Sequence, residues 1–553
     1  MDETLGRPVD RIEAGTPVLG APRLSLWQKV FYGAGDSTNS MSGTIIDLFL
    51  LFYFTDVLGL KPVLAGLVLL IGRIWDAVND PLVGYLSDRS KSRFGRRRIF
   101  MALSAVPLGV TYIFIWRIPA DVSDVAKMVL AILLYVLYDT FSTMFAVPFQ
   151  ALGNEISQNY DERTSLVAWR MLFSIVTGLI STVVPMMIVN SIQVVFPPDL
   201  LLSVNAAVTS GALPPNILDI MRGGLTSSNG SFTQEVLDKV RAAVSSGVLP
   251  ATFIDAVNTA VTAAKRIGYP LVGLIFGLSF IVFPFFPVIA FREKSDVERR
   301  HEPFLKSMGL ILKDATFRRL LGYYFLIWAT IGIIMAYMMY YFKYYLHMES
   351  SFDIIAGGMF VVAAFALPLW VKVSARYDKK VANIVGALIF GGILFTLLLP
   401  ADVIKAVWFT IPGLGLDVSL LVPMVIVIGI GLAAAHVMPN AIMPEAVDSC
   451  RLNTGIHSEG AYYGALNFCF KAGRAVAILL ASAALQWSGY QEVANSGVTP
   501  QAQPGSAVLV IQLIMGLVAP ILICSSVLLL RHYDIGRKEH AEILRRLAER
   551  DGE

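Results

Sequence analysis

The stretch Gly72-Arg-Ile-Trp-Asp-Ala-Val-Asn-Asp-Pro81 decides how this chain is interpreted. It lies within a long apolar run, yet it carries Arg73, Asp76 and Asp80. An ionisable side chain inside a membrane span costs about 2.5–3.5 kcal/mol even on lenient insertion scales. The three charges are spaced three and four residues apart, so they share one helix face with Asn79 beside them. Such a face predicts a polar cavity whose carboxylates bind a coupling cation.

The composition is that of an integral membrane protein. Of the 553 residues, 56% are hydrophobic and 15% are charged, whereas soluble domains carry about 25% charged residues. The net charge of +3 indicates no nucleic-acid partner, so the expected surroundings are the lipid bilayer and a small-molecule substrate. The polar segment 1–23 lacks the apolar core of a cleaved signal. The three cysteines predict no structural disulfide.

Twelve apolar runs are long enough to cross about 30 Å of hydrocarbon. The loops that follow even-numbered runs are rich in Lys and Arg, which predicts that both termini are cytoplasmic. The predicted spans are 28–57, 62–86, 98–118, 125–153, 164–190, 268–291, 317–346, 352–374, 381–400, 417–441, 458–487 and 507–531.

The two halves of the chain echo each other. The second span ends in Gly84-Tyr-Leu-Ser-Asp88 before a basic loop, and the eighth ends similarly in Val371-Lys-Val-Ser-Ala-Arg376. This repeat favours an all-α fold of two six-helix bundles around a central site. The predicted parts are a cytoplasmic segment 1–27, bundles 28–291 and 317–531, a cytoplasmic central loop 292–316 and a cytoplasmic tail 532–553.

Residues 191–266 interrupt this pattern after the fifth span and are expected outside the cytoplasm. Ala206-Ala-Val-Thr-Ser-Gly-Ala-Leu-Pro214 recurs as Ala242-Ala-Val-Ser-Ser-Gly-Val-Leu-Pro250. Apolar residues at helical spacing end at Ser-Gly and the chain restarts at Pro, which predicts two similar helical hairpins. The insert is interpreted either as a lid or partner-docking module, or as a surface loop that transport does not need.

The acidic face of span 62–86 offers oxygen ligands for a small cation. The carboxylates of Asp76 and Asp80 and the amide of Asn79 suit Na⁺ as a metal. A carboxylate pair suits H⁺ as well, because one of two close carboxylates holds a proton more tightly. Thr143 in span 125–153 adds a hydroxyl, unless it bonds only to its own helix. Asp139, one turn away, either lines the cavity or lies at its outer rim.

Basic residues in two further spans are the expected counter-charges. Asn467, Lys471 and Arg474 share one face of span 458–487. Lys471 either senses whether the cation is bound or forms a permanent ion pair between the bundles. Arg170, deep in span 164–190, is expected to meet a substrate or a carboxylate. Together with Arg73, these side chains are predicted substrate or coupling residues.

No motif indicates an enzyme. The chain has no Gly-Lys-Ser or Gly-Lys-Thr phosphate loop, which argues against an ATP-driven pump. No cofactor is expected besides the coupling ion. Charged residues at cytoplasmic helix ends are predicted to make gate contacts, namely Asp88, Arg89, Arg98, Glu445 and Asp448.

Several stretches carry a family resemblance: Tyr32-Gly-Ala-Gly35, Tyr53-Phe-Thr-Asp56, Arg73-Ile-Trp-Asp-Ala-Val-Asn-Asp-Pro81, Pro148-Phe149 and Lys471. They resemble the glycoside–pentoside–hexuronide:cation symporters of the major facilitator superfamily. Pro81-Leu-Val-Gly84, Gly431-Leu-Ala-Ala-Ala435 and Ser488-Gly-Tyr-Gln491 are similar to the sodium-dependent lysophospholipid symporters of that superfamily. The resemblance covers nearly the whole chain except 191–266 and the ends, and it implies a bacterial inner-membrane location.

The resemblance implies a retained cation site and an altered sugar site. The cation ligands of the melibiose-carrier-like family correspond to Asp76, Asn79, Asp80 and Thr143, and Lys471 and Arg170 also match. The family's first sugar-binding acid falls at Ser40, or at Ser37 if counted from Gly35. The second falls at Ala146, and the stacking aromatic falls at Gln150.

The chain is therefore predicted to be a secondary active symporter, coupled to Na⁺ or H⁺, that works by alternating access. Family resemblance favours a sugar or glycoside as the substrate. The missing sugar-binding residues favour a lysolipid or another amphiphile. The alternative of another class is a non-transporting membrane sensor or scaffold that docks a partner through 191–266.

Overall fold

The computed structural model is almost entirely helical along the residues that it describes. Eleven of the described helices are long and apolar enough to cross a membrane. The remaining predicted span, 28–57, is formed by α1 (Leu26–Ile45), the π-helical turn η1 (Ile46–Leu50) and α2 (Leu51–Asp56) in direct succession. The structure describes residues 24–90, 92–156, 160–192, 252–291, 312–411, 416–454, 459–492, 503–531 and 535–551, with Tyr533 and short pieces between 202 and 211.

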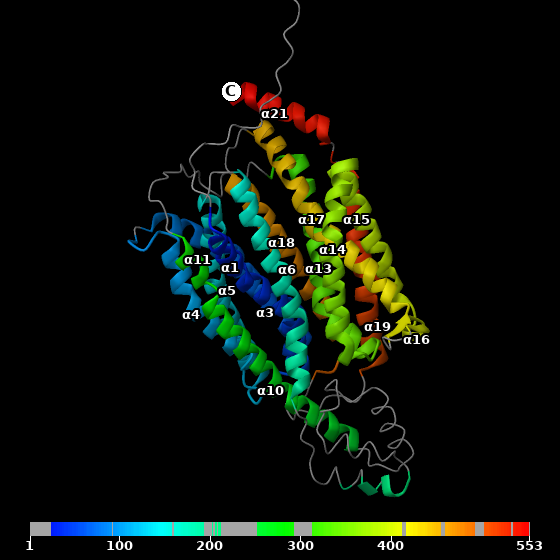
Figure 1. The fold of residues 1–553 in the computed structure, drawn as a ribbon. Helices are drawn as coiled ribbons and strands as arrows, with labels where there is room; N and C mark the ends of the chain where they lie inside the picture. The colour runs from blue at the N-terminus through cyan, green and yellow to red at the C-terminus, as the bar shows by residue number, and fades with distance from the viewer. Residues whose placement is uncertain are drawn as a thin grey trace, which may run out of the picture.

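The helices of the first half gather on one side of the molecule and are coloured blue to green in Figure 1. Within this half, α1 packs on α6, α5 packs on both α3 and α4, and α10 packs on α4. After α2, the helices are α3 (Pro62–Arg89), α4 (Arg98–Ile115), α5 (Asp124–Ile156), α6 (Tyr160–Ser191), α10 (Thr252–Val282) and α11 (Phe285–Ala290).

The second half forms a matching group, coloured green to red in Figure 1. Its helices are α13 (Ala315–Tyr340), α14 (Phe352–Tyr377), α15 (Lys379–Leu394), α16 (Ala401–Lys405), α17 (Leu421–Thr454), α18 (Glu459–Trp487), α19 (Gly505–Leu513), α20 (Ala519–Arg531) and α21 (Arg537–Asp551). The turns η2 (Tyr341–Tyr345), η3 (Glu349–Ser351), η4 (Phe395–Leu398) and η5 (Ile514–Val518) join or interrupt them.

The two halves meet along a seam that runs through the middle of the molecule. Across it α18 packs on α3, α14 packs on α6, and α13 packs on η1. The acidic face found in the sequence belongs to α3, so it lies on this seam. Most of α13 is buried, from Phe317 to Tyr340, because it contacts helices of both halves.

Two residues shape α3 beside its acidic face. Gly72 is needed because a Cβ atom there would overlap the ring of Tyr135 on α5. Pro81 lies inside the helix directly after Asp80. Its missing N–H leaves one backbone carbonyl of the preceding turn without its helical partner. A transmembrane helix tolerates such a residue where neighbouring helices are close.

The structure differs from the sequence-based spans in three places. The sixth span was expected to begin at 268, but α10 begins at Thr252 and continues into the bundle without a break. The tenth was expected to end at 441, but α17 continues to Thr454, past Pro439 and Pro444. A small antiparallel hairpin, β1 (Val407–Ile411) and β2 (Leu416–Ser419), precedes α17, so the fold is not purely helical.

The predicted helical hairpins of the insert lie largely outside the described residues. Of the range 191–266, the structure describes its two edges and short pieces between 202 and 211. The later edge, 252–266, is the first part of α10.

Candidate functional site

The acidic residues of α3 lie together on the seam. Asp76 and Asn79 are 4% and 2% exposed, and the Asp80 side chain is 26% exposed. Their spacing of three and four residues places them on one face, as the sequence predicts. Carboxylates this deeply buried require positive or hydrogen-bonding partners, because an unpaired buried charge is very costly.

Thr143 of α5 is placed between the two carboxylates. Its Oγ1 lies 3.3 Å from Asp76 Oδ1 and 3.2 Å from Asp80 Oδ1. A hydroxyl has one proton to donate and two lone pairs to offer. It therefore satisfies one carboxylate at a time, and its lone pairs are available to a cation between the two acids.

Lys471 of α18 reaches this acidic face from the other half of the molecule. Its Nζ lies 2.7 Å from Asp76 Oδ2 and also forms an ion pair with Asp80 Oδ2. The Lys471 side chain is 14% exposed. Lys471 therefore forms ion pairs with both acids of this face.

Two buried polar atoms next to these residues have no hydrogen-bond partner. They are Nδ2 of Asn79 and Oδ2 of Asp139. Asp139 is 6% exposed, so its carboxyl group faces the protein interior rather than an open rim. Buried polar groups are nearly always hydrogen-bonded in proteins. The donor set of carboxylate, amide and hydroxyl oxygens fits a hard monovalent cation.

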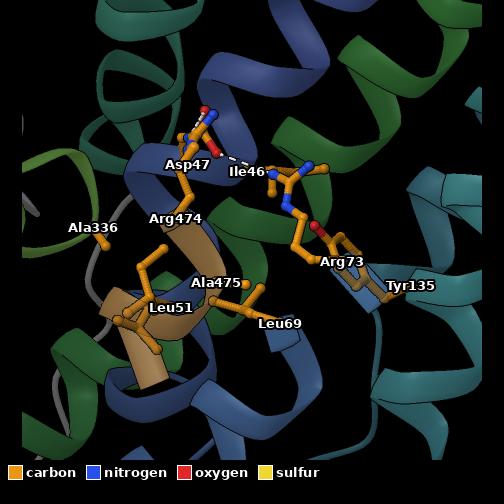
Figure 2. Close-up of a pocket in the computed structure, with 10 residues that line it drawn as sticks. Ile46, Asp47, Leu51, Leu69, Arg73, Tyr135, Ala336, Arg474 and Ala475 are labelled. Carbon is orange, nitrogen blue, oxygen red and sulfur yellow. Dashed lines mark hydrogen bonds and ion pairs between the residues drawn. The ribbon is translucent and has the colours of Figure 1, made fainter. Parts of the chain in front are cut away.

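A second charged cluster, which the sequence reasoning missed, continues from this site. Asp47 lies in η1 and forms ion pairs with Arg474 of α18 and, at 3.5 Å, with Arg73 of α3. Arg73 in turn lies 3.8 Å from Asp76. Figure 2 shows the Asp47 carboxylate between the two guanidinium groups. The charges therefore alternate without interruption from Arg474 to Asp76 on the acidic face of α3.

Apolar side chains surround this second cluster. Leu51, Leu69 and Ile478 line the same small pocket as Asp47 and the two arginines. The signal for Asp47 was present in the sequence, since it is an acid within an apolar span. Its partner could not be inferred there, because the π-helical turn shifts the face on which Asp47 lies.

The predicted substrate residues do not form one cluster: two lie at the contact of α1 with α6, and three lie elsewhere on α5 and α18. Arg170 of α6 lies 3.3 Å from Asp36 of α1, so a carboxylate is its partner. Ser40 of α1 donates a hydrogen bond to the Ser174 carbonyl at 2.6 Å, again between α1 and α6. Ala146 is half-buried on α5, whereas Gln150 on α5 and Asn467 on α18 are exposed.

Four of the predicted gate residues contact a residue of their own half. Arg89 lies over the Tyr85 ring at 4.2 Å, and Arg98 donates to the Val288 carbonyl at 2.8 Å. Glu445 lies 2.8 Å from Lys379, and Asp448 lies 2.9 Å from His540 of α21. Both acids lie within α17 rather than in a loop after it, and Asp88 lies in α3.

The seam has another charged cluster at its predicted outer end, around Asp56. This residue is 2% exposed. Lys343 Nζ lies 2.5 Å from Asp56 Oδ1, and the Tyr490 hydroxyl donates to Oδ2 at 2.5 Å. Tyr344 also donates to Oδ1, and the neighbouring Thr55 hydroxyl donates to Oδ2 at 2.8 Å. All available positions on this carboxylate are thus used, mostly by the second half.

A second ion pair beside it joins Lys265 of α10 to Glu349 in η3. Burial opposes ionisation of Glu349, but the charges of Lys265 and Lys343 outweigh it and hold the pKa of Glu349 below its ordinary value. This pair therefore ties the two halves together as a charged contact at neutral pH.

Comparison with known proteins places the chain among transporters. The family model described as MFS/sugar transport protein matches residues 31–537. The chain belongs to this family. An uncharacterised symporter of Synechocystis sp. is 26% identical over 96% of this chain and 98% of its own length. Sodium-dependent lysophosphatidylcholine symporter 1 of Gallus gallus is 26% identical over 94% of this chain and 88% of its own length.

The fold of this family member agrees with that assignment. The solved structure of the nucleoside transporter NupG aligns with a TM-score of 0.51 at 10% identity, over 92% of this chain and 99% of NupG. The predicted major facilitator fold is thereby confirmed.

Proposed function

We propose that this protein is a cation-coupled symporter whose cation is held by Asp76, Asn79, Asp80 and Thr143. The observation that carries the proposal is the meeting of two carboxylates and one hydroxyl on the seam, where both carboxylates pair with Lys471 from the other half. A cation entering between the acids competes directly with the Lys471 ammonium. Cation binding to the first half therefore weakens its ion pairs with Lys471 of the second half.

Asp47 extends this competition across the seam. A cation at Asp76 weakens the attraction of Asp76 for Arg73, which then turns more fully to Asp47. Asp47 also pairs with Arg474 of α18, so the strength of the Asp47–Arg474 ion pair changes with cation occupancy. The halves of a major facilitator move against each other around a central site, and this network links the ion to that movement.

The coupling ion in this proposal is Na⁺ or H⁺, and reciprocity requires substrate and ion to strengthen each other's binding equally. The substrate is a small solute. Family membership supports a sugar or glycoside, whereas Ser40, Ala146 and Gln150 supply none of the expected sugar ligands. Similarity to a lysophosphatidylcholine symporter supports an amphiphile as the second candidate.

The proposal includes a placement in a bacterial inner membrane with both termini cytoplasmic, supported by the Lys and Arg residues after even-numbered spans. It leaves 191–266 outside the cytoplasm. Deleting 212–250 keeps all of α10 and separates transport from docking. Transport that survives the deletion makes the insert accessory, whereas loss of transport with retained folding favours a role for a partner or lid.

The direct test compares the wild type with Asp80→Asn. A ligand present at 100 times its Kd stabilises the folded state by about 2.7 kcal/mol. A Na⁺-coupled protein should show a higher Tm in Na⁺ than in choline, a H⁺-coupled one should show no such increase, and Asp80→Asn should lose any increase that Na⁺ gives. Asp402→Asn, an exposed acid of α16, is the matched control and should behave as the wild type.

Uptake into proteoliposomes then distinguishes the substrates. Labelled melibiose and lysophosphatidylcholine are offered with and without an inward Na⁺ or H⁺ gradient. The expected result is gradient-driven uptake of one of them by the wild type and its loss in Asp80→Asn. Uptake by Asp80→Asn at the wild-type rate would overturn the cation assignment.

A further inference from the structure

A groove on the first half of the molecule is independent of the seam. It lies at the predicted outer end, where α2, α4 and α10 come together, and has about 1160 Å³ of empty space, counting its open side. Every described lining residue belongs to the first half. Its lining therefore shares no residue with the proposed cation site or with the charged cluster around Asp56.

Its walls are apolar and aromatic. Tyr53 of α2 lies against Trp116, which follows α4, with ring centroids 5.0 Å apart. Trp116 also stacks on Tyr269 of α10 at 5.7 Å with the rings nearly parallel. Ile267 on the rim is 61% exposed. These three rings are buried, so they form a firm apolar back wall for the groove.

Two arginines give the groove a positive charge. Arg117 is exposed at its edge and Arg266 is half-buried in its wall. Among the described residues neither has an ion-pair partner, and Asp121, the one acid in the lining, pairs with neither. The lining therefore carries a net charge of +1.

The Arg266 guanidinium is held in place but not saturated. Its Nε donates to the Val57 carbonyl at 3.3 Å, which fixes the group against the end of α2. Its Nη2 is buried and has no hydrogen-bond partner. A buried guanidinium nitrogen without an acceptor is costly. An anionic oxygen that accepts from Nη2 would remove that cost, and Arg117 lines the same groove.

We propose that this groove binds a phosphate-bearing lipid of the surrounding leaflet. Its phosphate lies between Arg117 and Arg266, because a guanidinium matches phosphate oxygens with two parallel donors. Its acyl chain leaves over Ile267 into the hydrocarbon. The ligand needs both a phosphate and an acyl chain. A free anion leaves the apolar wall uncovered, and a neutral lipid leaves Nη2 of Arg266 unpaired.

The test uses the full-length purified protein and native mass spectrometry to count bound lipid. The probe is phosphatidylglycerol, compared with diacylglycerol of the same chains and with inorganic phosphate as a competitor. We expect one phosphatidylglycerol to be retained, and roughly tenfold weaker binding for each arginine replaced, in Arg117→Gln and Arg266→Gln. Arg117→Gln changes an exposed side chain, so it tests the groove without disturbing the core.

Lys61→Gln provides the matched control, because Lys61 is an exposed cation at the same end of the molecule. It should retain phosphatidylglycerol as the wild type does. Unchanged binding in both arginine variants would overturn the proposal. So would retention of diacylglycerol equal to that of phosphatidylglycerol, or displacement of the lipid by inorganic phosphate at equal concentration.

Discussion

Two charged regions on the same seam differ in how completely their hydrogen bonds are satisfied. At the predicted outer end, Asp56 accepts from Lys343, Tyr344 and Tyr490 and is fully enclosed. At the cation site, one hydroxyl faces two carboxylates, and buried polar atoms nearby lack partners. A satisfied buried network favours a single arrangement, and an incompletely satisfied one is ready for a further partner. The difference separates charges that hold the halves together from charges that the proposed function assigns to ion binding.

The largest expected effect comes from breaking the satisfied region. Lys343→Met leaves Asp56 buried without its ammonium, and removing one partner of a buried ion pair costs about 3–5 kcal/mol. The outer end of the seam should therefore open. We expect a lower Tm and faster labelling of a cysteine introduced at Leu346, which is fully buried beside η2 and donates no bond to Asp56. Combining Lys343→Met with Asp56→Asn should recover much of the stability. A single variant as stable as the wild type would contradict this account.

The next effect concerns Asp47, which pairs with one arginine from each half of the molecule. Asp47→Asn leaves Arg474 and Arg73 close together without their shared carboxylate. We expect gradient-driven uptake to fall about tenfold or more, since a lost charge-assisted bond of this kind is worth about 1.5–3 kcal/mol. The double variant Asp47→Asn with Arg474→Gln should recover part of the uptake. A double variant no better than the single one would remove Asp47 from the coupling network.

A smaller effect is expected from the hydroxyl at the cation site. Thr143→Ala removes one oxygen ligand and should weaken the apparent affinity for the cation about 3–10-fold, in line with a single hydrogen bond of about 0.5–1.5 kcal/mol. Thr143→Ser keeps the oxygen and should stay close to the wild type. The measurement is the Na⁺ concentration that gives the half-maximal rise in Tm. Equal affinities for the Ala and Ser variants would show that the hydroxyl is not a ligand.

The smallest effect is a pH dependence at the outer end. The pKa of Glu349 lies below its ordinary value of 4.5 because Lys265 and Lys343 outweigh its burial. A lowered carboxyl pKa adds stability that is fully present above pH 4.5 and is lost as the pH falls through the folded-state value. Glu349→Gln should therefore lower Tm at pH 7 but narrow its difference from the wild type in acid. A difference that grows on acidification would reverse the assigned sign.

Much of the acidic cluster on α3 could be predicted from sequence because it depends on local spacing. Residues three and four apart on a helix share a face whatever surrounds them, and this applied to Asp76, Asn79 and Asp80. The pairing with Lys471 followed from charge alone, since a buried acidic face requires a cation. The spans were predictable for a related reason, because their apolar length is set by the bilayer.

Other features depend on contacts that sequence spacing does not encode. Asp56 and Lys343 are 287 positions apart, and only the docking of the two halves brings them together. The direction of Asp47 depends on a π-helical turn, which has no reliable sequence signal. The early start of α10 was missed because the charges of Asp255, Lys265 and Arg266 interrupt the apolar sequence before position 268, although the helix continues through them.

This continuity of α10 has a mechanical consequence. The part formed by 252–261 adds about 15 Å of helix beyond the apolar portion that begins at Thr262. Lys265, whose ammonium pairs with Glu349, lies on the same continuous helix. Tilting the projecting part therefore applies a torque at the contact between the halves. An antibody fragment raised against this projection is expected to act as a lever on the carrier from outside the membrane, without entering the route taken by ion or substrate.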